Sequence, residues 1–322
     1  MTGSFKDFEA LPTLLHFREL GRDAIILASA GNTARAFAYA ATILDFTAYL
    51  VVPEAMLARL WLPIRPSEAV RVIVVEGSHD YAGAIHFAST LSERFGIPPE
   101  GGARNVARRD GMGTSVLEHA RVTGALPRHY VQAVGSGTGA IAAWEAALRL
   151  RGAGFDGPLP ALHLAQNTPF APIHDAWTDG TPIRPDEDVP AQLARVRAIV
   201  SDVLANRNPP YAVPGGVADA LRATNGRTYA VTNEEIAEAQ RLFEETEALP
   251  ISPEAGAAVA ALRRGVAEGA IGAEEPVLLN VTGNNDALLR RDYELHPLPA
   301  WLRLTPEEVA ADRLDRWVDR FA

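Results

Sequence analysis

The sequence predicts an α/β protein with mostly parallel sheet, divided into two lobes. Apolar runs typical of buried strands alternate with helical patterns, which is the order expected of a parallel sheet. The chain has 322 residues, whereas a single hydrophobic core stops growing at about 250–300 residues. We therefore expect two lobes, with a boundary near residues 122–129.

The first part of the chain alternates strictly between the two kinds of pattern. Strands are predicted at 23–30, 47–53 and 69–77. Each is followed by a helical pattern, at 32–45, 54–63 and 80–96. Proline ends the second strand and glycine ends the last helix, as their backbone preferences favour.

The second part resumes the alternation with three further apolar strands. They are predicted at 130–134, 160–166 and 276–283. Residues 165–190 are rich in proline and aspartate, which favours an ordered surface excursion. Residues 306–321 have the pattern of a charged amphipathic helix.

Composition excludes several classes of protein. The chain carries a net charge of -10 and no cysteine, so disulfides, thiolate zinc sites and cysteine nucleophiles are excluded. Arginines are scattered among acids, which disfavours nucleic acid and favours a small-molecule partner. The eight histidines include no pair at metal-binding helical spacing, so no metal site is predicted. No run reaches the roughly 18–20 apolar residues of a spanning helix, no signal peptide is recognised, and a cytoplasmic location is expected.

A glycine-rich turn follows the strand at 130–134 and precedes a helix. Such a turn brings backbone amides and a helix N-terminus toward one point, where a phosphate is the favoured ligand. The spacing matches neither the Gly-Lys-Ser/Thr phosphate loop nor Gly-x-Gly-x-x-Gly. A tight turn without a ligand is the alternative. The candidate residues are Gly135, Ser136, Gly137, Thr138 and Gly139.

A second turn of this kind follows the strand at 23–30. Its amides are suited to a carboxylate, and Asn32 can donate to an oxygen anion. Helix capping alone explains Asn32 and Thr33 equally well. The candidate residues are Ser29, Ala30, Gly31, Asn32 and Thr33. Thr282, near the end of the strand at 276–283, is a further candidate, although a hydroxyl there is usually a plain strand-end residue.

Two basic features each admit two interpretations. Lys6 stands before an apolar-periodic stretch, where a lysine is most often solvated; when desolvated, it becomes a nucleophile toward a carbonyl such as an aldehyde cofactor. The segment "GGARNVARRDG" is either a solvated loop or an anion-binding lip. Its candidates are Arg104, Asn105, Arg108 and Arg109.

Three motifs together resemble fold type II pyridoxal phosphate (PLP) enzymes, the threonine synthase and cysteine synthase superfamily. They are "TGSFKD", "SAGNTARAFAYAA" and "VGSGTG". The resemblance implies that Lys6 binds PLP covalently and that Asn32 bonds its phenolic oxygen. It implies that Ser29 to Thr33 hold the substrate carboxylate, Gly135 to Gly139 the cofactor phosphate, and Thr282 the pyridine nitrogen.

Within this superfamily, longer stretches such as "GGARNVARRDGMGT" and "LHLAQNTPFAPIHDAW" look most like the cysteate synthase family. That resemblance implies replacement of the phosphate of O-phospho-L-serine by sulfite, through an aminoacrylate intermediate. It strengthens the anion-binding interpretation of the arginine segment. Three alternatives remain: a threonine synthase, a deaminating lyase on another hydroxy or phospho amino acid, and a catalytically silent remnant that binds ligand.

The resemblance also implies an architecture similar to the tryptophan synthase β subunit, with open twisted sheets covered by helices on both faces. Residues 1–22 and 127–322 would form a large cofactor-binding lobe, and residues 23–126 a smaller mobile substrate-binding lobe. Members of the superfamily carry roughly a hundred further residues before the lysine. The sequence is therefore expected to be N-terminally truncated, by a mis-chosen start codon, and the protein is expected to form a homo-oligomer.

Overall fold

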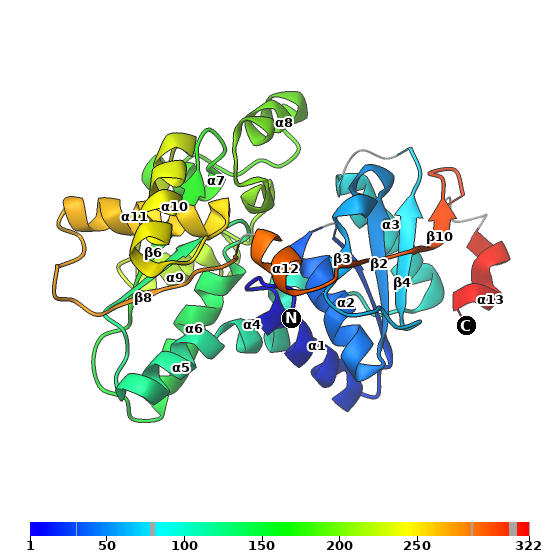
Figure 1. Ribbon diagram of the computed structural model, residues 1–322, viewed down its shortest axis with the longest axis horizontal. Coiled ribbons are helices and arrows are strands. Elements are labelled where there is room, and N and C mark those ends of the chain that lie inside the picture. Colours follow the sequence, from blue (N-terminus) through cyan, green and yellow to red (C-terminus); the bar gives the residue numbers. More distant parts are fainter. Residues whose placement is uncertain (30, 78–80, 285, 309–313, 322) are drawn as a thin grey trace. The chain divides into compact units, whose positions relative to one another are not determined.

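The protein is described by a computed structural model that covers residues 1–29, 31–77, 81–284, 286–308 and 314–321. The chain forms two compact units (Figure 1). Unit 1 comprises Met1–Gly111 and Ala287–Ala322, and unit 2 comprises Met112–Asp286. Each unit contains its own parallel sheet.

Unit 1 is built on a four-stranded sheet in the order β1-β2-β4-β10. All its neighbouring strands are parallel. A short antiparallel pair, β3 with β9, accompanies it. The bounds are β1 Ala24–Ala28, β2 Thr47–Pro53, β3 Trp61–Leu62, β4 Val70–Val75, β9 His296–Pro297 and β10 Ala300–Leu304.

Helices cover both faces of this sheet because its strands are apolar on both sides. Along β2, Leu50 packs with residues of α1 and α2 on one face, while Val51 packs with residues of α3 on the other. The helices and 3₁₀ turns (η) of unit 1 are α1 Asp7–Glu19, α2 Asn32–Leu44, η1 Glu54–Arg59, α3 Tyr81–Phe95, η2 Gly102–Arg104, α4 Val106–Met112, α12 Asp286–Asp292, η4 Leu314–Trp317 and α13 Val318–Phe321; α4 and α12 each cross a unit boundary by one residue.

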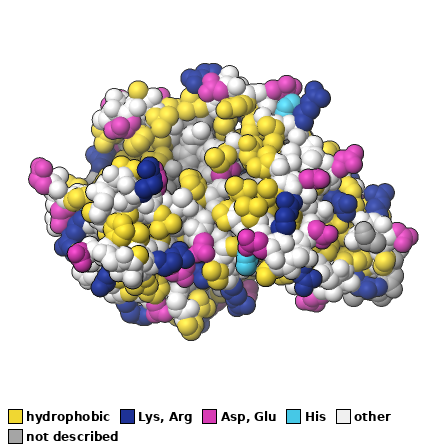
Figure 2. Space-filling view, turned by 90° about the horizontal axis from the view of Figure 1, so that it is seen from below, with side chains coloured by type: hydrophobic (Ala, Val, Ile, Leu, Met, Phe, Trp, Pro, Cys, Tyr) yellow, Lys and Arg dark blue, Asp and Glu magenta, His cyan; other side chains and the backbone are white. Residues whose placement is uncertain are grey.

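One side of α1 is buried and the other is open. Ala10 and Leu14 are fully buried, whereas Phe8, Leu11 and Leu15, which follow helical spacing, are 37–45% exposed. On the face drawn in Figure 2, hydrophobic side chains lie interspersed with charged ones.

Unit 2 is built on a second parallel sheet, in the order β7-β6-β5-β8. Helices α5, α6 and α9 pack on one face, and α10 and α11 on the other. The bounds are α5 Thr114–Thr123, β5 His129–Ala133, α6 Thr138–Gly152, β6 Ala161–Asn167, α7 Pro172–Thr178, α8 Val189–Ala198, η3 Asp202–Leu204, α9 Val217–Ala223, β7 Arg227–Val231, α10 Asn233–Glu247, α11 Pro253–Ala267 and β8 Val277–Leu279.

The predicted α/β class and the six predicted strands are confirmed. The helix predicted at 54–63 is wrong beyond residue 59, because buried Trp61 and Leu62 pair with β9 as a strand. The helix predicted at 306–321 lies partly outside the described residues, and its described part forms η4 and α13. None of the described helices is long and apolar enough to cross a membrane.

The compact units have different bounds from the predicted lobes. Residues 1–22 belong to unit 1, because α1 buries Ala10 and Leu14 in the same core as α2. Residues 300–304 also belong to unit 1, because β10 extends its sheet beside β4. Residues 112–126 belong to unit 2, where α5 packs on α6.

Candidate active site

The turn before Lys6 is fixed by one carboxylate. Asp7 accepts hydrogen bonds from the backbone amides of Thr2 at 2.9 Å and Gly3 at 3.1 Å. It also accepts one from the Thr2 hydroxyl at 2.7 Å. Lys6 caps the N-terminus of α1 and begins the helix immediately after this turn. The backbone at Lys6 is therefore held on both sides.

The Lys6 side chain lies in a charged and largely enclosed environment, with 27% of its surface exposed. Its Nζ lies 3.3 Å from Oε2 of Glu9, whose side chain is fully buried. Burial lowers the pKa of Lys6; Glu9 opposes this shift, and the Arg108 guanidinium adds to it. A lysine with a lowered pKa holds more neutral amine at physiological pH, as a nucleophile requires.

Lys6 is also the single lysine of the sequence, beside 29 arginines. A covalent link to an aldehyde requires a primary amine, which arginine does not offer. Lys6 therefore carries the one ε-amine in this sequence that can form such a link.

The turn after β1 has the geometry of a helix start. Ser29 is buried, and its hydroxyl accepts from the amide of Ala34 at 3.2 Å. Asn32 is the first residue of α2, and its side-chain oxygen accepts from the Arg35 guanidinium. Gly31 caps the helix; Ala30 lies outside the described residues. Among the described residues, Lys6 makes no hydrogen bond or ion pair with Ser29 or Asn32.

The turn after β5 opens the 15-residue helix α6. Gly137 caps this helix with φ +77°, a conformation that favours glycine. The hydroxyls of Ser136 and Thr138 lie 2.8 Å apart, and the Thr138 amide donates to Ser136 Oγ. The backbone amides of Gly135, Ser136 and Gly137 make no hydrogen bond to the described residues. Free amides beside a helix N-terminus suit an anion.

Thr282 lies at the same edge of the sheet as this turn. Strands β5 and β8 are parallel neighbours, and the amide of Asn280 donates to Val131 O at 2.9 Å just beyond β8. Thr282 follows two residues later, past the strand that was expected to include it. It is 9% exposed, and its Oγ1 has no hydrogen-bond partner in the described part of the chain.

Most of the arginine segment is helical, in η2 and α4, which differs from the solvated loop that was one of its two interpretations. Asn105 caps α4 by accepting from the Arg108 amide at 3.2 Å, which explains where the helix begins. Arg108 is buried and paired with Glu9 and Glu100. Arg109 donates to Ala103 O at 2.5 Å, and Arg104 is exposed. Asn105 and Arg108 thus have internal partners, whereas Arg104 stays open to solvent.

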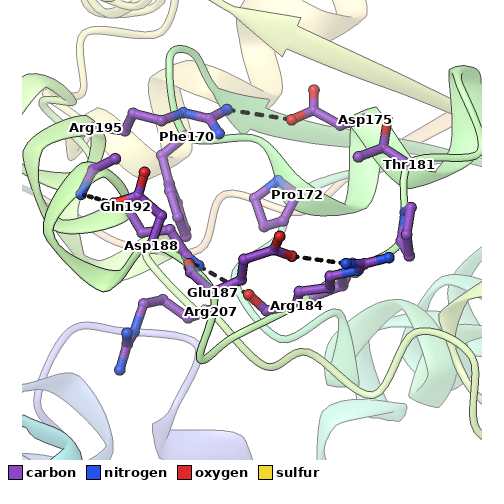
Figure 3. A pocket seen from close by; sticks show the side chains of 13 residues that line it. Phe170, Pro172, Asp175, Thr181, Arg184, Glu187, Asp188, Gln192, Arg195 and Arg207 are labelled. Carbon is purple, nitrogen blue, oxygen red and sulfur yellow. Dashed lines mark hydrogen bonds and ion pairs between the residues drawn. The ribbon is translucent and has the colours of Figure 1, made fainter.

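Unit 2 contains a pocket formed by residues of the predicted excursion and the segment after it (Figure 3). Two ion pairs lie among its lining residues: Arg184 with Glu187 at 3.1 Å, and Arg195 with Asp175 at 3.3 Å. None of the site residues predicted from the sequence lines it. The lining residues are Phe170, Pro172, Asp175, Thr181, Pro182, Ile183, Arg184, Glu187, Asp188, Ala191, Gln192, Arg195 and Arg207.

The predicted site residues fall into two groups, one in each unit. In unit 1, the structure brings Lys6 and Arg108 together around Glu9, a residue that sequence reasoning missed. In unit 2, it places the 135–139 turn and Thr282 at one sheet edge. A glutamate inside the apolar-periodic stretch that follows Lys6 was the available signal for Glu9.

The chain belongs to the pyridoxal-phosphate dependent enzyme family, whose model matches residues 1–283. It is therefore a PLP enzyme, and its two parallel sheets covered by helices give it an α/β fold.

Among curated relatives, the chain is 46% identical over 318 residues to the cysteate synthase of Methanocella paludicola, covering 98% of this chain and 74% of that protein. It is 44% identical to the cysteate synthase of Methanosarcina barkeri, covering 97% and 76%. The cysteate synthase of Methanoculleus marisnigri is 47% identical, covering 96% and 72%.

Solved structures share the fold at low identity. Maize serine racemase has a TM-score of 0.65 at 15% identity, covering 90% of this chain and 83% of that one. The processed threonine deaminase isoform 2 of Solanum lycopersicum has a TM-score of 0.66 at 19% identity, covering 90% and 78%. These likenesses confirm the fold alone.

The residues present fit PLP in three respects. The free amides of the 135–139 turn suit its phosphate. The unpartnered hydroxyl of Thr282 suits a single polar atom such as a ring nitrogen. The depressed pKa of Lys6 suits a bond to an aldehyde carbon.

Proposed function

We propose that the protein is a cysteate synthase, which replaces the phosphate of O-phospho-L-serine with sulfite to give L-cysteate and phosphate. The supporting observation is the similarity to cysteate synthases along nearly the whole chain. A homo-oligomer and a cytoplasmic location stay predictions of the sequence.

When bound, PLP withdraws electrons from the α-carbon of the amino acid, which acidifies the α-proton and lets the β-substituent leave. We assign Lys6 two tasks: its Nζ would hold the cofactor, and its free neutral amine would accept the α-proton. Burial lowers the pKa of Lys6, which supports the second task, because a general base must be neutral before it takes a proton.

The other residues bind and orient. In unit 2, the turn 135–139 would hold the cofactor phosphate, and Thr282 would face the pyridine nitrogen. A neutral hydroxyl there leaves that nitrogen without a proton, which limits electron withdrawal and favours elimination followed by addition.

In unit 1, Asn32 would bond the phenolic oxygen of the cofactor. The amides and hydroxyls of Ser29 to Thr33 would hold the substrate carboxylate. Arg104 is open to solvent and is the arginine of its segment best placed to attract phosphoserine and sulfite. Arg109, also expected to bind the anion, is half-buried and donates to Ala103 O, so we assign it a lesser part.

The proposal is tested by measuring phosphate release and cysteate formation from O-phospho-L-serine, with and without sulfite. We expect both products only when sulfite is present, and cysteate equal in amount to phosphate. O-phosphohomoserine is the matched control, because a threonine synthase would release phosphate from it. Inertness of phosphoserine in the PLP-loaded enzyme would contradict the proposal.

The role of Lys6 is tested separately, by borohydride reduction of the PLP-loaded chain and peptide mapping. We expect one pyridoxyl adduct, on Lys6. Lys6→Arg keeps the charge but cannot form the bond, so its adduct and its visible absorbance band should vanish. An adduct confined to the N-terminal amine would contradict the assignment.

A further inference from the structure

We propose that Glu9 is a positioning residue for Lys6: its carboxylate, oriented by Arg108, which Glu100 anchors in turn, holds the ε-amine in place. This inference deepens the proposed function, because it rests on Lys6 being the residue that holds the cofactor.

Glu9 stands between two cations. It follows Lys6 by three residues on α1, so both side chains lie on one side of the helix. Its Oε2 lies 3.3 Å from Lys6 Nζ, and its Oε1 lies 2.8 Å from Arg108 Nη2. Because each carboxylate oxygen faces a different cation, the carboxylate has a defined orientation.

Arg108 is itself anchored. It is 8% exposed, and its Nη1 lies 2.7 Å from Oε2 of Glu100. The amide of Glu100 donates to Ile26 O of β1 at 3.0 Å, and Asn105 donates to Glu100 O at 2.8 Å. The cluster thus connects α1 to the sheet of unit 1 and to the start of α4, so Glu9 cannot move without disturbing both.

The charges of the cluster balance, with two cations and two carboxylates. The neighbouring charged groups are engaged elsewhere: Asp7 bonds the amides of the N-terminal turn, and Arg109 donates to Ala103 O. Neutralising Glu9 would leave Lys6 and Arg108 facing a single carboxylate. Burial already lowers the pKa of Lys6, and Glu9 is the strongest influence that raises it again. Losing that charge must lower the pKa further.

The experiment measures the pH dependence of Lys6 acylation in the full chain after removal of the cofactor. An amine-selective acylating reagent is the probe, and peptide mass spectrometry follows Lys6, whose ε-amine has no lysine competitor in this sequence. In Glu9→Gln, we expect the labelling midpoint to fall by about one pH unit, which makes labelling about tenfold faster below the wild-type midpoint. Glu9→Asp, which keeps the charge, should restore much of the midpoint.

Two further variants show how the labelling midpoint of Lys6 depends on the distance of the removed charge. Glu100→Gln should lower the midpoint less, because Glu100 acts from the far side of Arg108. Glu19→Gln, at the exposed end of the same helix, should leave it unchanged. An unchanged or raised midpoint in folded Glu9→Gln overturns the proposal. If that variant does not fold, an unchanged midpoint in Glu100→Gln overturns it.

The labelling uses neither phosphoserine nor sulfite. Failure to form cysteate would therefore leave this result intact, and an unchanged Lys6 midpoint would leave the proposed reaction intact.

Discussion

The hydroxyl of Thr282 is buried without a partner in the described part of the chain. Thr282→Val removes this hydroxyl at nearly constant shape. We expect the cofactor-free protein to keep its stability or gain up to about 1 kcal/mol, because an unpaired buried polar group is costly. PLP affinity should fall about five- to tenfold, the loss of about 1 kcal/mol for one hydrogen bond. Thermal unfolding and PLP titration measure the two effects.

Thr224→Val is the matched control for this substitution. Thr224 is also buried, but its hydroxyl donates to Ala220 O at 2.7 Å. Its replacement should cost about 1 kcal/mol of stability and leave PLP affinity unchanged. Unchanged PLP affinity in Thr282→Val would remove the assignment of Thr282 to the pyridine nitrogen.

Individual site residues differed in how far the sequence predicted them. Local motifs located the turns at 29–33 and 135–139, because such turns depend on neighbouring residues. The partners of Lys6 were not predictable in this way, since Glu9 and Arg108 are 99 positions apart and meet only in the folded chain. Arg108 was expected to face an anion, and the structure gives it two carboxylates of the protein instead.

At the scale of the elements, Gly137 fixes how β5 turns into α6. Its φ of +77° is strained for other residues, and an added Cβ would overlap Val217 of α9. Gly137→Ala should therefore destabilise the protein by about 1–3 kcal/mol and weaken PLP binding. Gly152→Ala, at the other end of α6 where an added Cβ meets open space, should be neutral or stabilise by up to about 1 kcal/mol. Chemical denaturation measures the free energy of unfolding of both variants. Equal stabilities of Gly137→Ala and Gly152→Ala would contradict this explanation.

The strands of unit 2 share a buried chain of hydrogen bonds. His129 of β5 lies 2.8 Å from Glu275 and 3.0 Å from His163 of β6, and His163 lies 2.8 Å from the hydroxyl of Tyr229 in β7. Burial, with a contribution from His129 and Arg227, lowers the pKa of His163 to about 4. Burial raises the pKa of Tyr229 to about 12, so its hydroxyl stays protonated.

This network predicts acid sensitivity of unit 2. His163 binds a proton less readily in the folded than in the unfolded chain. Its contribution to stability is therefore complete above the ordinary histidine pKa near 6.5 and is lost as pH falls toward 4. The loss is on the order of 2–3 kcal/mol. Urea unfolding between pH 7.5 and 4.5 should show this slope in wild type and in the exposed control His86→Gln, and a shallower one in His163→Gln. Parallel slopes in all three would contradict the prediction.

Helix and strand identities were largely predictable, because buried parallel strands form apolar runs that end at glycine or proline. Two exceptions have different causes. Residues 61 and 62 pair with residues 296 and 297, and no local pattern contains that partner. The cap at Asn105 was readable in principle, but the glycines around it favoured a loop.

At the scale of the whole molecule, β10 completes unit 1 from far along the chain. Leu304 is fully buried against the sheet, whereas Arg303 beside it is exposed and pairs with Glu54. Leu304→Ala should cost about 2–5 kcal/mol. Hydrogen exchange should then accelerate in β2 and β4 and stay unchanged in β5 and β6. Arg303→Ala should cost at most about 1 kcal/mol. Equal loss of protection in both units would contradict the division into units.

The bounds of the units were the least predictable property, because they depend on which distant segments pair. The boundary between the compact units lies one helix before the division expected near residues 122–129, since α5 packs on α6. Residues 300–304 were expected in the same lobe as the residues that precede them in the chain. They belong to unit 1 because β10 pairs with β4.

That pairing has a consequence for biosynthesis. Unit 2 is one uninterrupted segment, so all of it has been synthesised before residues 300–304 exist. Until β10 emerges from the ribosome, the edge of β4 that it pairs with has unpaired backbone N–H and C=O groups. Such an edge can pair with other chains and aggregate. Unit 1, which contains Lys6, therefore completes its sheet only after the whole of unit 2 has been synthesised.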